Sequence, residues 1–166
     1  MLCNNAAMTN EQLAAIGDLS INFSALDESV NFVLCKLLRC PDEDAAALMI
    51  GGLSFGARVE RIRLLVRYYA TTHGLAKSDT VKRFNETIAQ IVAISEERNR
   101  LIHTYIRFDP DRQFTVFLID SKSGVRIDAE PEQIKAISAR AFTAAVALLP
   151  HVQQLLKNVP SAKPAS

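Results

Sequence analysis

The chain has 166 residues, of which 49% are hydrophobic and 22% charged, and its formal net charge at pH 7 is +1. This composition is typical of a globular protein and excludes a disordered chain, and the length fits one domain with a sizeable core. A net charge so close to zero excludes a global field that recruits nucleic acid, so any basic site must be local.

Targeting signals and a disulfide framework are both missing from the sequence. Residues 1–12 lack the basic and apolar segments of a signal peptide, and no apolar run approaches the ~20 residues of a membrane span. The three cysteines, Cys3, Cys35 and Cys40, have no framework spacing. We therefore expect a cytoplasmic protein with buried or idle thiols and no membrane contact.

The first predicted helix begins at Thr9 or Asn10 and ends before Pro41, because proline disfavours helical geometry in the residue that precedes it. Its apolar residues recur at alternating steps of three and four, which predicts a long helix packed lengthwise on its neighbours. They are Ile16, Leu19, Phe23, Leu26, Val30, Val33 and Leu37. A short helix is predicted over residues 42–50, closed by a glycine pair.

Two further helices are predicted in the middle of the chain. The third begins at Ser54 and stops near Gly74, since glycine commonly follows a helix end. Its expected inward residues are Phe55, Val59, Ile62, Val66 and Tyr69, with its arginines elsewhere. The fourth is capped by Ser78 or Asp79 and extends for about 25 residues by its period. Its expected core residues are Val81, Phe84, Ile88, Ile91 and Val92.

The pattern changes over residues 105–129, which carry β-branched and aromatic residues and turn signals. Residues 113–119 and 125–128 predict the two strands of a hairpin that lies against the helices, because two strands alone are marginally stable in water. A last helix begins at Pro131, where the missing N–H costs nothing. Its expected inward residues are Ile134, Ile137, Ala141, Ala145, Leu148, Val152 and Leu155.

These elements predict a mainly α fold. It is an up-and-down bundle of four to five helices with a β-hairpin inserted before the last helix. We expect a single domain over residues 1–159 and a disordered tail over residues 160–166.

One polar cluster interrupts the apolar face of the fourth helix. At 100° per residue, the apolar arc extended by one turn reaches Arg98, Asn99 and Ile102, with His103 at its edge. An unpaired buried charge costs several kcal/mol, so a polar groove or a second subunit must face these groups. A structural role is the alternative: Arg98 could pair with Asp27 or Glu28, and His103 could cap the helix C-terminus.

The string Arg98-Asn99-Arg100-Leu101-Ile102-His103 resembles the Arg-x4-His motif, in its Arg-Asn-x3-His form, of the HEPN superfamily (higher eukaryotes and prokaryotes nucleotide-binding). In that superfamily the motif also lies near the end of a long helix in an all-α bundle. Residues 53–59 resemble the phenylalanine–glycine start of a helix in bacterial relatives, and the resemblance spans about residues 10–157.

The resemblance implies a metal-independent endoribonuclease, without cofactors, in which two subunits pair their motif helices. His103 would move a proton to or from the reacting ribose oxygens, and Arg98 would stabilise charge on the phosphorane. Asn99 would orient His103 or the phosphate. The implied context is a toxin–antitoxin pair, phage defence or stress response, with RNA as substrate, an antitoxin as a further partner, and no DNA.

Several residues around this cluster are secondary candidates. Tyr105 fits a His-x-Tyr extension found in part of the superfamily, although a packed strand residue is the alternative, and Glu96 and Arg100 are accessory candidates. On the third helix, Arg58 and Arg61 are candidate RNA-binding residues, and with Arg63 and Arg67 they could form an RNA track; a solvated helix face is the alternative.

Two other functions stay open at this stage. A HEPN-like bundle could bind RNA, nucleotides or another protein without catalysis. An ordinary helical dimer could use Arg98 in an ion pair across its interface.

Overall fold

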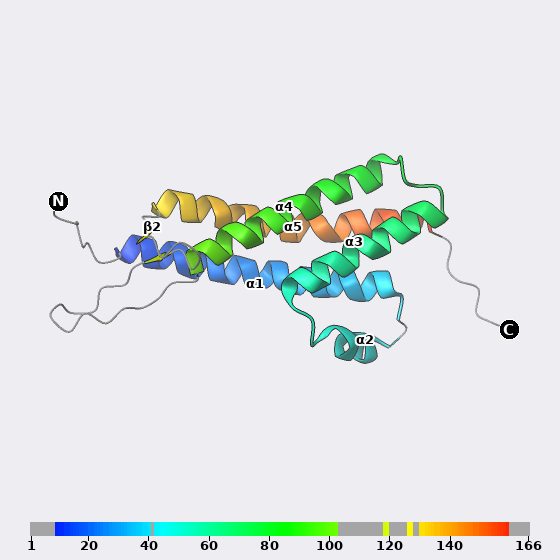
Figure 1. Cartoon of the computed structure of the whole chain (residues 1–166), viewed down its shortest axis with the longest axis horizontal. Coiled ribbons are helices and arrows are strands. Elements are labelled where there is room, and N and C mark those ends of the chain that lie inside the picture. Colours follow the sequence, from blue (N-terminus) through cyan, green and yellow to red (C-terminus); the bar gives the residue numbers. More distant parts are fainter. Residues whose placement is uncertain (1–8, 41, 103–117, 120–125, 128–129, 160–166) are drawn as a thin grey trace. The chain divides into compact units, whose positions relative to one another are not determined.

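The computed structural model describes residues 9–40, 42–102, 118–119, 126–127 and 130–159. These residues form five helices and two short strands (Figure 1). They are α1 (Asn10–Leu38), α2 (Glu43–Ile50), α3 (Phe55–Thr72), α4 (Asp79–Ile102), β1 (Leu118–Ile119), β2 (Arg126–Ile127) and α5 (Pro131–Lys157). The prediction of a mainly α fold is confirmed.

The chain divides into two compact units. The first unit comprises Met1–Phe23 and Ala93–Ala141, and the second comprises Ser24–Val92 and Phe142–Ser166. Helices α1, α4 and α5 each contribute residues to both units. Each unit is described by itself below.

Helix starts follow the capping chemistry of the sequence. The Thr9 hydroxyl accepts a hydrogen bond from the backbone N–H of Gln12 at 3.1 Å, and the Gln12 side chain accepts one from the N–H of Thr9 at 2.9 Å. This reciprocal pair is a capping box. Side chains of Asp42, Ser54 and Ser78 accept from the first backbone N–H groups of α2, α3 and α4. The predicted helix starts are therefore confirmed.

Helix ends in the second unit use the left-handed backbone region. Gly74, just after α3, has φ of 68°, which glycine adopts without a steric penalty. Arg39, just after α1, has φ of 50° although it carries a side chain. Its guanidinium donates to the carbonyl of Val159 at 2.9 Å and lies over the Tyr69 ring. These contacts hold a backbone conformation that arginine rarely adopts.

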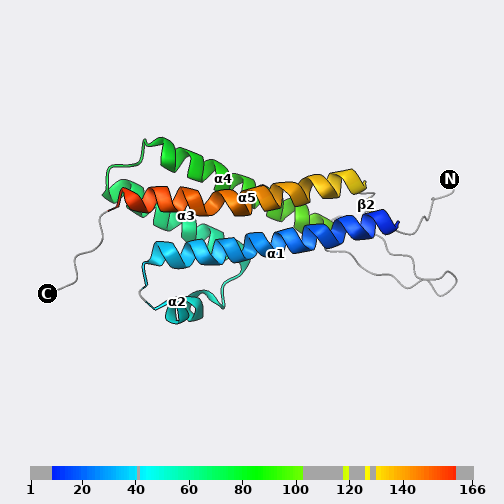
Figure 2. The same ribbon diagram turned by 180° about the vertical axis from the view of Figure 1, so that it is seen from behind.

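In the second unit, α1 and α3 lie side by side and run in the same direction. Asp27 of α1 forms an ion pair with Arg58 of α3, and the Tyr69 hydroxyl of α3 donates to the carbonyl of Leu37 at 2.7 Å. Both contacts occur in the same order along the two helices. The short α2 and its connections therefore return the chain between two parallel helices, which Figure 2 shows from behind.

In the first unit, side-chain contacts join α1, α4 and α5. The Asn22 amide donates to the hydroxyl of the buried Ser138 at 2.8 Å. Arg140 of α5 donates to both carboxylate oxygens of Glu97 of α4, at 3.0 and 2.9 Å. Parts of three helices are thus fixed around the last turns of α4.

The buried residues confirm most of the predicted inward positions. All seven positions predicted for the last helix are buried in α5. Ile16 and Val92 are only half-buried, whereas Ala15 and Ile94 are buried in their helices instead. The inward faces of α1 and α4 are therefore rotated slightly from the predicted ones. Phe55 and Tyr69 are also half-buried, since they lie near the ends of α3.

Strands β1 and β2 pair antiparallel, with Leu118 opposite Ile127 and Ile119 opposite Arg126. These four residues are the described part of the segment for which a hairpin was predicted. The rest of that hairpin, residue Tyr105 and the tail at 160–166 lie outside the described residues, so their structure stays a prediction. Among the described helices, none is long and apolar enough to cross a membrane.

Candidate functional site

Arg98 lies on the buried face of α4, in the first unit. Ile94, four residues before it, is 1% exposed, and Leu101, three residues after it, is 7% exposed. These spacings place the three side chains on one side of the helix. Arg98 is itself half-buried. Arg98 therefore lies in line with two buried residues of α4, Ile94 and Leu101.

The Arg98 guanidinium contacts Phe23 and Asn99. Its central carbon lies 4.7 Å from the centroid of the Phe23 ring of α1, within the range of a cation–π interaction. Its Nη1 donates to the side-chain oxygen of Asn99 at 3.1 Å. Phe23 is only 9% exposed, so the ring screens one face of the cation from water. An aromatic face and an amide therefore compensate a charge on an otherwise apolar stripe.

The residues beside Arg98 on α4 have different surroundings. Asn99 is half-buried, whereas Glu96 and Arg100 are exposed. Glu97 is paired with Arg140 of α5. The carboxylate that directly precedes Arg98 is therefore neutralised by another arginine. Arg98 and Asn99 are brought together, and the two accessory candidates, Glu96 and Arg100, lie on the outer side of the helix.

The expectation that Arg58 faces outward from its helix is wrong. Its side chain is 12% exposed and forms an ion pair with Asp27 of α1, because α1 and α3 lie alongside each other in the second unit. Asp27 was one of the two carboxylates considered as a partner for Arg98. The other arginines of the predicted RNA track, Arg61, Arg63 and Arg67, are exposed on α3.

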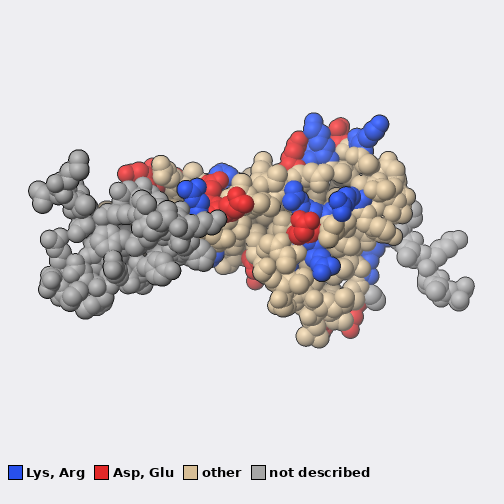
Figure 3. Space-filling view, in the orientation of Figure 1, with Lys and Arg blue, Asp and Glu red and all other residues tan. Residues whose placement is uncertain are grey.

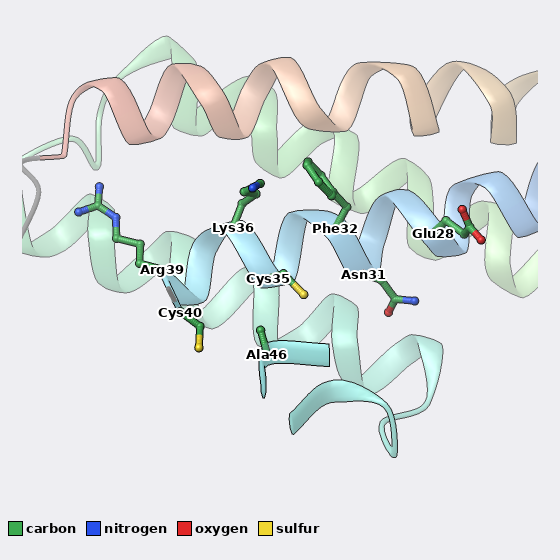
Figure 4. Close-up of a pocket in the computed structure, with 8 residues that line it drawn as sticks. All are labelled: Glu28, Asn31, Phe32, Cys35, Lys36, Arg39, Cys40 and Ala46. Carbon is green, nitrogen blue, oxygen red and sulfur yellow. The ribbon is translucent and has the colours of Figure 1, made fainter. Parts of the chain in front are cut away.

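A separate cavity of about 410 Å³ lies between α1 and α2 in the second unit (Figure 4). Asn31 and Cys35 lie on the side of α1 that faces α2, and the side-chain oxygen of Asn31 is buried without a hydrogen-bond partner among the described residues. Cys35 and Cys40 are among the residues that line the cavity. Among the predicted site residues that the structure describes, none lines this cavity.

His103 and Tyr105 lie outside the described residues. Helix α4 ends at Ile102, so the structure describes the motif as far as the residue before His103. Within the described ranges, no group of three or more His, Cys, Asp and Glu side chains could hold a metal ion.

Sequence reasoning missed the role of Phe23, which was predicted only as a core residue. No local signal links it to Arg98, because the two residues are far apart in the sequence and meet only when α1 and α4 pack.

No protein-family model matches the chain, and no curated protein or solved structure matches it.

Proposed function

We propose that this protein is a metal-independent endoribonuclease of HEPN type that acts as a homodimer through the end of α4. The observation that carries the proposal is the half-buried Arg98, stacked on Phe23 and bonded to Asn99, on the turns that lead into His103. A permanently charged, planar guanidinium in a partly desolvated position suits a phosphodiester whose charge grows during reaction.

In the proposed reaction, the imidazole of His103 takes the proton of a ribose 2′-hydroxyl. The 2′-oxygen then attacks the adjacent phosphorus, and the bond between phosphorus and the 5′-oxygen breaks. A second imidazole, from the other copy, gives a proton to the departing 5′-oxygen. The products are a 2′,3′-cyclic phosphate and a 5′-hydroxyl, and Arg98 stabilises the phosphorane between them.

Two copies are proposed because the reaction needs an acid and a base together, whereas one motif supplies a single histidine. A half-buried arginine at the end of a buried stripe also favours a polar partner surface at that position. The chemistry suits an RNA-degrading toxin, a phage-defence factor or a stress-response nuclease, and an antitoxin is the further partner expected for the first of these.

The test is cleavage of single-stranded RNA by the purified protein in the presence of EDTA. We expect product ends that resist phosphatase until mild acid opens them, which identifies a cyclic phosphate. His103→Ala should abolish cleavage, whereas Arg83→Ala, an exposed arginine earlier on α4, should retain it.

Three results would reject this function. One is cleavage that persists in His103→Ala, since the activity then comes from elsewhere. Another is a free 3′-hydroxyl at the newly formed end of the upstream product, because transesterification leaves the phosphate at that end. Tight RNA binding without turnover would also reject it and favour the non-catalytic alternative.

A further inference from the structure

Positive charge is concentrated on one part of the second unit. Residues 54–92 contain seven Lys and Arg against three Asp and Glu, although the whole chain carries a net charge of only +1. These residues form α3 and the first half of α4. In Figure 3, Lys and Arg side chains outnumber acidic ones over the face that these helices present. The local charge favours an anionic ligand.

A groove runs between these two helices. A hollow of about 520 Å³ has the buried side chains of Val66, Ala70 and Val81 among its lining residues, with Arg63 and Arg67 of α3 beside them. A second hollow shares Val81 with the first. Its cations are Lys77 and Lys82, and Asn85 of α4 lines both hollows. The first hollow therefore brings an amide and two cations together, and the second, lined by the connection between the helices and by α4, adds two more cations beside it.

The cations of this groove have few acidic partners among the described residues. Arg67, Lys77 and Lys82 are exposed and form no ion pair with any residue in the described part of the chain. Arg63 lies 3.6 Å from Glu60, but both side chains are more than half exposed, and such pairs contribute little. Arg58 and Arg140, in contrast, are each paired with a carboxylate from another helix.

We propose that this groove binds single-stranded RNA. Phosphates would contact Arg63 and Arg67 in the first hollow and Lys77 and Lys82 in the second, because cations hold the backbone without regard to sequence. The exposed amide of Asn85, which lines both hollows, would offer hydrogen bonds to a base edge. Glu60 and Glu86 line the same hollows, so the phosphates avoid those positions.

The choice of RNA among anionic polymers rests on the proposed function, whereas the phosphate contacts do not. The groove lies in the second unit and the motif in the first, so the inference adds a substrate-binding surface to the reacting groups. Its residues can therefore be tested without touching Arg98, Asn99 or His103.

The test is binding of a fluorescently labelled oligouridine to the full-length His103→Ala protein, measured by anisotropy in EDTA. The double variant Arg63→Gln/Arg67→Gln should lose about tenfold or more in affinity. The slope of the logarithm of affinity against the logarithm of salt concentration should become shallower by about 1.4, because two phosphate contacts to a single strand are lost. The matched control Arg83→Gln/Lys157→Gln also removes two exposed charges from the second unit, and neither residue lines the groove. It should lose less than about twofold.

An equal loss of affinity in both double variants would overturn the inference, because net charge alone would then explain binding. Unchanged binding in the groove variant would also overturn it. Inorganic polyphosphate that displaces the oligouridine at equal charge concentration would reject RNA as the ligand. All four residues are exposed, and matching circular dichroism spectra will verify that the variants fold.

A parallel cleavage assay separates the two proposals. If the wild type leaves RNA intact while the groove variant loses binding, the nuclease proposal fails and the groove assignment stands. If the wild type cleaves RNA and the groove variant binds as tightly as its parent, the groove assignment fails and the nuclease proposal stands.

Discussion

The guanidinium of Arg98 lies over the ring of Phe23, with its central carbon 4.7 Å from the ring centroid. The ring belongs to α1 and is almost fully buried, so that water screens this contact less than it screens a surface pair. The contact fixes the charge at the end of the buried face of α4. Arg98 is thereby positioned before any ligand arrives.

This contact predicts an energetic coupling between Phe23 and Arg98. In a double-mutant cycle with Phe23→Leu and Arg98→Met, we expect a coupling of about 0.5–1 kcal/mol in the free energy of unfolding. Urea denaturation measures it. A cycle that pairs Phe23→Leu with Arg83→Met should be additive within about 0.5 kcal/mol. A coupling of zero in the first cycle would mean that the ring contributes only apolar burial.

The hydrogen bond between Arg98 and Asn99 predicts opposite effects on stability and activity. Asn99→Asp keeps an acceptor for Arg98 and adds an opposite charge, so the protein should remain at least as stable. The same carboxylate should neutralise the guanidinium and lower RNA cleavage by about a hundredfold. Thermal unfolding and initial cleavage rates provide the two readouts. Full activity in Asn99→Asp would show that Arg98 does not contact the phosphate.

The ion pair between Arg58 and Asp27 predicts a structural role for Arg58. Arg58→Ala should lower the free energy of unfolding by about 1–3 kcal/mol, because a mostly buried charge pair is broken. Arg61→Ala, an exposed arginine three residues later, should change stability by less than about 0.5 kcal/mol. Urea unfolding of the two variants compares them directly. Equal effects would contradict a structural role for the ion pair.

The ion pairs of Lys135 predict that the free energy of unfolding depends on pH in the alkaline range. Hydrogen bonds to Glu132 and Glu11 raise the pKa of Lys135 above its ordinary value of 10.5. The charged form therefore stabilises the fold below that ordinary value, and this contribution is lost as the pH rises through the raised pKa. The difference in unfolding free energy between wild type and Lys135→Met should shrink over that range. A difference that stays constant with pH would show that the pairing adds nothing.

Local chemistry explains why the helix boundaries could be predicted. Thr9, Ser54 and Ser78 cap helices through hydrogen bonds to residues three positions away, so the signal is complete within one turn. The position of Arg98 follows from the same kind of local information. A helix repeats every 3.6 residues, and the apolar arc therefore predicts which face a later residue occupies.

Contacts between distant segments explain what could not be predicted. Asp27 and Arg58 pair because α1 and α3 are parallel, and nothing near either residue in the sequence specifies that packing. Phe23 meets Arg98 for the same kind of reason. The groove between α3 and α4 also depends on how two helices pack, although the arginines of α3 are visible in the sequence.

The most direct test of the central claim is the rate of RNA cleavage by Arg98→Ala in EDTA, measured beside Arg83→Ala and wild type. The account predicts that Arg98→Ala remains folded and loses about 10²–10³ in rate, as expected when a group that stabilises the phosphorane is removed. Arg83→Ala should cleave at the wild-type rate. Cleavage by folded Arg98→Ala at the wild-type rate would contradict the account.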